Sequence, residues 1–167
     1  MSEGDQDAIG QAWDAVVATA RRTASEGLVV GTSGNVSARV GDTVLVTPSA
    51  VHYDRLGPHD AVGVDLGGRR LFGDLPPTSE LPLHLAVYNS TCAAAVVHTH
   101  AVHATAVSTL VDEVPLVHYA AAMLGGPVRT APYARYGTRE LRSRGAPPRS
   151  APHTTRRRRR RPHTGRR

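Results

Sequence analysis

The chain has 167 residues, of which 40% are hydrophobic and 20% charged, which predicts one domain with a hydrophobic core and excludes a wholly disordered chain. A single cysteine and the absence of lysine exclude an internal disulfide, a CxxC zinc motif and catalysis through a lysine Schiff base. The net charge of +6 comes from Gly145–Arg167, which holds nine of the 20 arginines, whereas residues 1–144 carry a net charge of −3 and do not form a basic nucleic-acid-binding domain.

The N-terminal half of the chain predicts one helix and four strands. From Asp7 to about Ala24, apolar residues recur with the spacing of an amphipathic helix. After this helix, alternating residues around a Gly-Asp turn and a Gly-Gly turn predict two β-hairpins. The four strands are predicted at Asn35–Val40, Thr43–Thr47, Ala61–Asp65 and Arg69–Phe72.

The second half predicts a similar mixture of elements. A helix is predicted from Glu80 to Tyr88, with Thr78 or Ser79 as its cap, and the apolar run Ala94–Val97 predicts a buried strand. The remaining predicted elements are a helix at Ala101–Leu110, strands at Val114–Tyr119 and Val128–Ala131, and a helix start at Thr138–Leu141. This mixture indicates an α/β fold of the α+β type or a three-layer sandwich, with a mainly antiparallel sheet.

Two histidines follow the apolar run. Because strand residues at positions i and i+2 point to the same face, the imidazoles of His98 and His100 are predicted to converge, as the ligands of one cation do. Zinc is the default metal for such a pair, and other divalent transition metals also fit. Hydrogen-bonded core histidines are the alternative, which the spacing alone does not exclude. His103 falls on the next predicted helix and is not expected to join the pair.

Glu80 is the second candidate site residue. It begins a predicted helix, where the helix dipole stabilises a carboxylate, so a purely structural role is one interpretation. Close to two metal-binding histidines, the same carboxylate would act as a ligand or as a general base. His84 lies one helical turn further along the same face, and we expect it to pair with Glu80 rather than to bind a metal.

Three short polar segments form the third candidate feature. Backbone amides in glycine-rich turns, hydroxyl groups and a helix N-terminus together can bind an anion without a lysine. Turn formation and helix capping explain each segment equally well when it is taken alone. The segments are Gly31–Asn35, Thr47–Ser49 and Thr78–Ser79.

Six motifs taken together resemble a known family. They occur in the order GTSGNVSARV, VLVTPSAVHYDRL, LPPTSELPLHLAVY, AAVVHTHAVHATAVS, VPLVHYAAAMLGG and APYARYGTREL. Over roughly residues 8–142 this order resembles the class II aldolase/adducin family. The resemblance implies a three-layer α/β/α sandwich, usually a homotetramer, with a catalytic zinc between neighbouring subunits. It also implies a metal-dependent aldehyde-lyase that cleaves a sugar phosphate by a retro-aldol reaction.

The resemblance also implies roles for individual residues. His98 and His100 match the paired zinc ligands, and Glu80 matches an acid/base carboxylate that can also touch the metal. Tyr119 matches a tyrosine that reaches a neighbouring subunit's site and handles the aldehyde oxygen. Ala50 stands where the aldolases commonly have glycine. The phosphate-binding positions match Gly34, Asn35, Ser49, Thr78 and Ser79.

The resemblance ends before a third zinc histidine that the family carries on a later strand. Here residues 145–167 form an Arg-rich segment, predicted to be disordered, as a shifted reading frame would produce. We therefore expect an incomplete domain at residues 1–144, with C-terminal elements missing and a zinc site weakened by the loss of one ligand. The tail lacks aromatic residues, so it would contact nucleic acid only nonspecifically.

The expected protein is thus a cytoplasmic sugar-phosphate aldolase whose activity is impaired by the missing histidine. No apolar run approaches the ~18 residues of a membrane span, and the acidic first residues differ from a signal peptide. The alternatives are a pentulose-phosphate 4-epimerase of the same fold and a non-catalytic adducin-like binding or scaffold protein. The presence of His98, His100 and Glu80 argues against the scaffold, and the missing histidine argues for it.

Overall fold

The structure is a computed structural model that describes residues 3–124, 126–135, 138 and 140. The predicted tail at residues 145–167 lies outside these residues, as do Arg139 and Leu141 of the predicted helix start. Among the described helices, none has the length and apolar character needed to cross a lipid bilayer.

A five-stranded sheet in the order β4-β3-β2-β1-β5 forms the centre of the fold, and every neighbouring pair of strands is antiparallel. The first four strands form two consecutive hairpins, as predicted. The fifth strand adds beside β1, where Asn35 lies opposite His98. The strand bounds are Asn35–Val40 for β1, Thr43–Val46 for β2, Val62–Asp65 for β3, Arg70–Phe72 for β4 and Ala95–His98 for β5.

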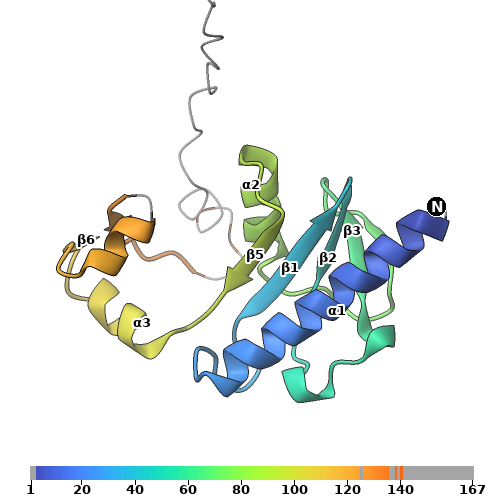
Figure 1. The fold of residues 1–167 in the computed structure, drawn as a ribbon, viewed down its shortest axis with the longest axis horizontal. Helices are drawn as coiled ribbons and strands as arrows, with labels where there is room; N and C mark the ends of the chain where they lie inside the picture. The colour runs from blue at the N-terminus through green and yellow to red at the C-terminus, as the bar shows by residue number, and fades with distance from the viewer. Residues whose placement is uncertain (1–2, 125, 136–137, 139, 141–167) are drawn as a thin grey trace, which may run out of the picture.

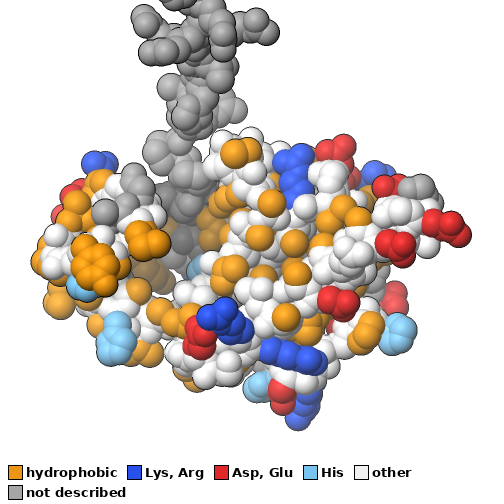
Figure 2. Space-filling model, in the orientation of Figure 1, with side chains coloured by type: hydrophobic (Ala, Val, Ile, Leu, Met, Phe, Trp, Pro, Cys, Tyr) orange, Lys and Arg blue, Asp and Glu red, His pale blue; other side chains and the backbone are white. Residues whose placement is uncertain are grey.

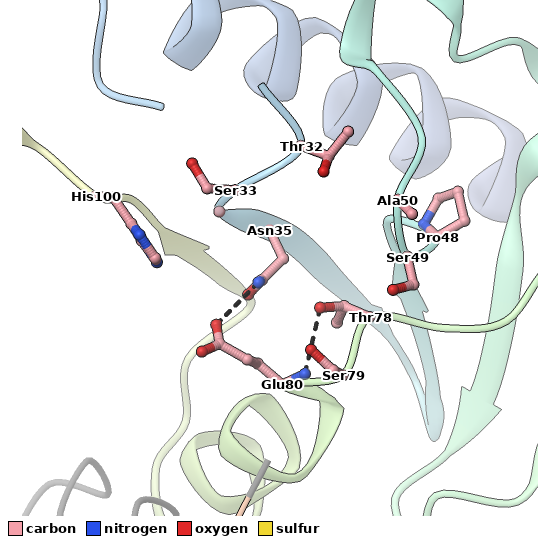
Figure 3. A pocket seen from close by; sticks show the side chains of 11 residues that line it. Thr32, Ser33, Asn35, Pro48, Ser49, Ala50, Thr78, Ser79, Glu80 and His100 are labelled. Carbon is pink, nitrogen blue, oxygen red and sulfur yellow. Dashed lines mark hydrogen bonds between the residues drawn. The ribbon is translucent and has the colours of Figure 1, made fainter. Parts of the chain in front are cut away.

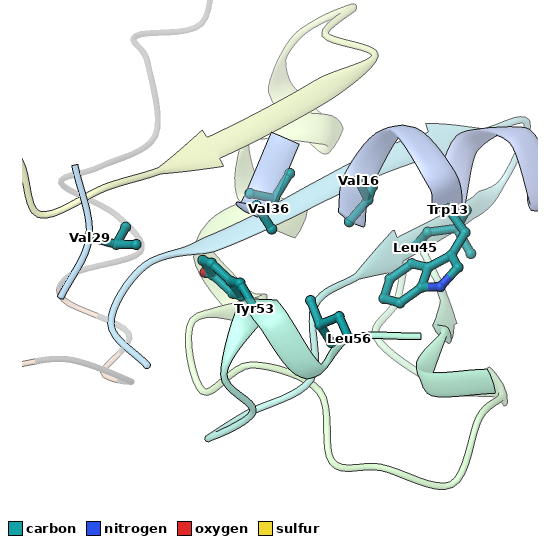
Figure 4. Packing of buried hydrophobic residues seen from close by; sticks show 8 residues of the cluster. Trp13, Val16, Val29, Val36, Leu45, Tyr53 and Leu56 are labelled. Carbon is teal, nitrogen blue, oxygen red and sulfur yellow. The ribbon is translucent and has the colours of Figure 1, made fainter. Parts of the chain in front are cut away.

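Helix α1 (Glu3–Ser25) lies across one face of the sheet (Figure 1). Its buried residues Trp13 and Val16 pack with Leu45 of β2 and with Tyr53 and Leu56, which lie in and just after the 3-10 helix η1 (Tyr53–Arg55) (Figure 4). Each such buried apolar side chain contributes roughly 1.5–3 kcal/mol. The helix begins four residues before the predicted Asp7, because the acidic residues in its first turn interact favourably with the helix dipole.

Helix α2 (Leu81–Ser90) covers the opposite face of the sheet. Its residues Leu81 and Tyr88 pack against Val44 and Val46 of β2, and against Val62 of β3. Strand β2 thus alternates between the two cores, since the intervening Leu45 belongs to the α1 side. The described residues therefore form the expected three-layer α/β/α arrangement around an antiparallel sheet.

The segment that follows β5 lies beside the sheet rather than on it (Figure 1). Its apolar side chains remain exposed, and hydrophobic atoms gather on this part of the surface (Figure 2). The exposed residues include Leu110, Leu116, Val117, Tyr119, Met123 and Leu124. The elements of this segment are α3 (Val102–Ser108), β6 (Glu113–Val114), the 3-10 helix η3 (Tyr119–Leu124) and β7 (Val128–Arg129).

Two predictions for this region are wrong. The strand predicted at Val114–Tyr119 ends at Val114, because Pro115 has no N–H to donate to a ladder, and a 3-10 helix begins at Tyr119. The strand predicted to be buried before His98 is an outer strand of the described sheet, and its Val97 is 48% exposed. A continuous apolar run resembles a buried strand, but the sequence does not reveal which strands lie at the edge.

One backbone position contains a residue that does not suit its conformation. Ala50 has a φ of 59°, in the left-handed region where a side chain costs about 1 kcal/mol and glycine does not. We therefore expect Ala50→Gly to raise the free energy of unfolding by about 1 kcal/mol in urea titrations. The matched control is Ala61→Gly, because Ala61 has a φ of −63° and the change should destabilise. If Ala50→Gly left the free energy of unfolding unchanged or lowered it, Ala50 would not be strained.

Candidate active site

A pocket of about 200 Å³ opens where three segments meet at one end of the sheet (Figure 3). One segment is the loop before β1, the second follows β2, and the third leads into α2. All three are the polar segments that the sequence singled out. The pocket is lined by Thr32, Ser33, Gly34, Asn35, Pro48, Ser49, Ala50, Thr78, Ser79, Glu80 and His100.

Glycine is required at position 34 by both its conformation and its surroundings. Gly34 has a φ of 80°, and a Cβ atom there would lie 2.5 Å from Cγ1 of Val29 and 2.9 Å from the carbonyl oxygen of His98. The absence of a side chain therefore lets the loop approach the end of β5. This close approach brings the loop and the two histidines to the same end of the sheet.

Backbone hydrogen bonds align the other two segments. Ser49 N–H donates to the carbonyl of Pro76 at 2.9 Å, and Thr78 N–H donates to the carbonyl of Thr47 at 3.2 Å. Thr78 Oγ1 also accepts a 3.3 Å bond from the N–H of Glu80. The N-cap residue of α2 is Glu80, which makes no side-chain capping bond, so the prediction that Thr78 or Ser79 caps this helix is wrong. Among the described residues, the hydroxyls of Ser49 and Ser79 have no hydrogen-bond partner, which leaves both free to bind an anion in the pocket.

The two predicted metal ligands and the predicted acid/base residue lie together beside this pocket. Nε2 of His98 is 2.9 Å from Nε2 of His100 and 3.1 Å from Oε2 of Glu80. His98 ends β5, His100 follows it, and Glu80 precedes the first turn of α2. Residues from the sheet edge and from the helix thus converge on one point, as the strand spacing predicts for the histidine pair.

The donor atoms fit a divalent transition metal in kind. Imidazole nitrogens and carboxylate oxygens are among the usual protein ligands of zinc. In the part of the chain that the structure describes, no group of three or more His, Cys, Asp or Glu side chains is arranged as a complete metal site. The described residues therefore provide a converging but incomplete ligand set.

The electrostatics of His98 favour the form that binds metals. Burial lowers the pKa of His98 below its usual value, the Glu80 carboxylate opposes this change, and the charge of His100 adds to it. A neutral imidazole has a free nitrogen lone pair for a cation. The lowered pKa of His98 thus favours its neutral form, which is able to bind a cation.

His84 does not pair with the Glu80 side chain as predicted, because Asn35 lies between them. Asn35 Nδ2 donates to Oε2 of Glu80 at 2.9 Å, and Asn35 Oδ1 bonds to Nε2 of His84. On the other side of the ring, His84 Nδ1 is 2.6 Å from the hydroxyl of Ser37, which is 2.7 Å from the hydroxyl of Tyr88. Ser37 and Tyr88 were not predicted as partners of His84, although Tyr88 continues the spacing of four residues from Glu80 to His84.

Two other sequence candidates lie away from the pocket. Tyr119 is 84% exposed, and its ring contacts the ring of His118 at a centroid distance of 4.2 Å. His103 is an exposed residue of α3, as expected for a histidine outside the ligand set. Neither side chain lines the pocket.

Comparison with known proteins identifies the family. Residues 14–156 match the Class II Aldolase and Adducin N-terminal domain. The chain belongs to the class II aldolase/adducin family. Its sequence is 48% identical over 117 residues to the L-fuculose phosphate aldolase of Escherichia coli K12, a match that covers 69% of this chain and 54% of that protein.

Other class II aldolase relatives include enzymes named for different sugar phosphates. The chain is 40% identical over 128 residues to a 5-methylthioribulose-1-phosphate/5-deoxyribulose-1-phosphate aldolase of E. coli O45:K1, covering 75% of this chain and 60% of that protein. The chain thus spans little more than half the length of these relatives.

Solved structures confirm the predicted class II aldolase fold. An L-fuculose 1-phosphate aldolase matches with a TM-score of 0.77 at 30% identity, over 80% of this chain and 65% of that one. The L-fuculose-1-phosphate aldolase from Thermus thermophilus matches with a TM-score of 0.66 at 28% identity, over 78% and 66% of the two chains. The three layers and the antiparallel sheet described above are therefore those of this family.

Proposed function

We propose that this chain is a metal-dependent aldehyde-lyase that cleaves a ketose 1-phosphate by a retro-aldol reaction. The observation that carries the proposal is the convergence of Glu80, His98 and His100 beside a pocket lined by hydroxyl groups. A metal-free binding protein would not need a carboxylate and two imidazoles in contact at the entrance to such a pocket. The relatives named for sugar phosphates provide the substrate class.

The pocket binds the substrate's phosphate group in this proposal. The free hydroxyls of Ser49 and Ser79 donate to phosphate oxygens, and the loop at Gly34 and the residue Thr78 complete the cradle. Asn35 lines the same pocket, but its amide is already bonded to Glu80 and His84. Asn35 therefore connects the phosphate cradle to the acid/base residue.

His98 and His100 would hold the metal ion, with zinc as the expected ion and Glu80 as an additional ligand. The ion would supply Lewis-acid stabilisation of the negative charge that develops on the substrate's oxygens. The donor types support this assignment, since neutral imidazoles suit zinc and other divalent transition metals.

Glu80 moves the proton in the proposed reaction. When the carbon–carbon bond breaks, its electron pair passes to the carbon beside the carbonyl group, and Glu80 delivers a proton to that carbon. The leaving fragment becomes an aldehyde as its hydroxyl releases a proton to solvent through Tyr119 of a neighbouring subunit, and reprotonation of Glu80 from solvent closes the proton balance. In the reverse direction Glu80 removes the proton that it delivered, so the same carboxylate serves both directions of the aldol reaction.

Under this proposal the chain forms a homotetramer, and Tyr119 reaches the active site of a neighbouring subunit. There it acts on the aldehyde oxygen of the substrate. Its 84% exposure and its distance from the pocket of its own chain support a role in another copy. The exposed apolar residues around it, including Val117 and Met123, are suited to burial against that copy.

The test is an assay of the purified chain with L-fuculose 1-phosphate and 5-methylthioribulose 1-phosphate after loading with Zn²⁺. We expect cleavage to an aldehyde and a three-carbon ketone phosphate, and at least a tenfold loss of activity after removal of the metal with a chelator. Conversion of a pentulose phosphate to its epimer without cleavage would indicate an epimerase instead. No turnover of any ketose phosphate by the zinc-loaded chain would reject the proposal.

A further inference from the structure

A continuous chain of five polar side chains crosses the interface between α2 and β1. Glu80, His84 and Tyr88 recur every fourth residue and therefore share one face of the helix. Asn35 and Ser37 are two residues apart and share one face of the strand. The two sets alternate along the interface in the order Glu80, Asn35, His84, Ser37, Tyr88.

This polar chain is buried at a position where apolar residues would be the ordinary choice. His84 and Ser37 are completely inaccessible to solvent, and Tyr88 and Asn35 are at most 5% exposed. Around it, α2 and the sheet pack through valines and leucines. Buried polar groups add little net stability even when fully bonded, and an unpaired one costs about 1–3 kcal/mol. Glu80, at one end of this polar chain, and its neighbour Asn35 line the pocket, whereas His84, Ser37 and Tyr88 do not.

The direction of the hydrogen bonds follows from the chemistry of the groups. Asn35 Nδ2 donates to Oε2 of Glu80, so the amide presents its oxygen, which can only accept, to Nε2 of His84. His84 must then donate from Nε2 and accept at Nδ1 from the hydroxyl of Ser37. The hydroxyl of Tyr88 in turn donates to Ser37. Each side chain in the series therefore donates its hydrogen bond to the next one in the direction of Glu80.

We propose that His84 is a positioning residue for the reaction: with its proton on Nε2, it orients the Asn35 amide so that Glu80 is held against His98 and the pocket. This role depends on the function proposed above and adds a residue that touches neither substrate nor metal. Ser37 fixes the ring through Nδ1, and Tyr88 fixes Ser37.

The consequence for Glu80 is a defined orientation of its carboxylate. Oε2 of Glu80 bonds to Asn35 and lies 3.1 Å from Nε2 of His98. If the Asn35 amide turned over, its oxygen would face the carboxylate and repel it from His98. Burial, with a smaller effect from the charge of His98, lowers the pKa of His84 to about 4. A neutral ring with one donor and one acceptor is the form that the hydrogen-bond geometry requires.

The first test is independent of activity. Long-range ¹H–¹⁵N NMR spectra of the wild-type chain, with His84 assigned by comparison with His84→Gln, report which ring nitrogen carries the proton at pH 7. We expect the Nε2–H form of His84. A predominant Nδ1–H form would reverse the direction of the hydrogen bonds between these five side chains. That result would overturn the proposal, whether or not the protein proves to be an aldolase.

The second test is a double-mutant cycle. His84→Phe fills the same space without hydrogen bonds and should lower kcat about 10- to 100-fold, with KM and metal content unchanged. His84→Gln, which retains a donor and an acceptor, should recover part of the lost activity. In a Glu80→Gln background, His84→Phe should cause no further loss, because the orientation of the carboxylate no longer matters. His59→Phe, a change at an exposed histidine, is the matched control.

The outcomes separate the two proposals. If the wild-type chain cleaves no ketose phosphate, the proposed function is wrong. If the wild type is active and Glu80→Gln retains full turnover, Glu80 is not the acid/base residue, and the positioning role of His84 is rejected with it. If Glu80→Gln loses turnover but His84→Phe retains full kcat, the aldolase proposal stands and the positioning role is rejected. An equal loss from His84→Phe in both backgrounds would show that the residue acts through general folding stability rather than through Glu80, which would also reject the role.

Discussion

Glu80→Gln is expected to lower kcat of sugar-phosphate cleavage by about 10²- to 10⁴-fold, the usual contribution of a general acid or base. The amide keeps the size of the side chain and can still bond to Asn35, but it cannot take up and release a proton at neutral pH. Metal content should stay near that of the wild type, because His98 and His100 are unchanged. The measurement is steady-state cleavage of a ketose 1-phosphate together with metal analysis of the same sample.

Glu26→Gln is the matched control for this change. Glu26 is an exposed residue that pairs with Arg22 at 2.7 Å, and a surface ion pair of this kind contributes little to stability. Its removal should leave kcat unchanged. Retained turnover in Glu80→Gln would remove Glu80 from the mechanism, and a parallel loss of metal would show that Glu80 serves chiefly as a ligand.

His98→Ala is expected to weaken Zn²⁺ binding by more than about 100-fold. Substitution of residues that merely orient metal ligands already costs 10- to 100-fold, and His98 is the central member of the cluster, in contact with both His100 and Glu80. The backbone pairing of β5 with β1 does not depend on the imidazole, so the fold should persist. Equilibrium dialysis against Zn²⁺ with metal analysis measures the effect, and circular dichroism checks the fold.

His103→Ala is the control for the metal experiment, since His103 is exposed on α3 and outside the candidate site. It should bind Zn²⁺ as tightly as the wild type. If His98→Ala and the wild type bind equally, the histidine pair is a structural contact, and a metal site elsewhere in the chain would have to be sought.

The first half of the fold could be predicted from the sequence because local signals agree there. Strand β1 has the predicted bounds Asn35–Val40, and its hairpin with β2 turns at Gly41, which has a φ of 58°. Alternation and a glycine at the turn are properties of neighbouring residues, so they can be read without knowledge of the fold. Beyond β5 such signals are weaker, and the prediction around Pro115 was wrong.

The site was predictable only in part, because only some of its contacts are set by residues that are neighbours in the sequence. The convergence of His98 and His100 was predicted from strand spacing, which is local, although β5 ends at His98 and His100 follows it. The partners of His84 depend on which strand lies under α2, and neither the helix nor the strand contains that information alone. For this reason Ser37 and the intervening Asn35 amide were not predicted as partners of His84, whereas the spacing of Glu80 and His84 on one helix face was recognised.

The register of β5 against β1 makes the candidate site sensitive to insertions and deletions in β5. Asn35 lies opposite His98, and successive side chains of a strand alternate between its two faces. A slip of β5 by one residue would turn the imidazole of His98 to the α1 side and bring Val97 to face Glu80. A one-residue insertion or deletion in β5 would thus remove the proposed cation ligand His98 from the site while leaving the composition of the strand almost intact.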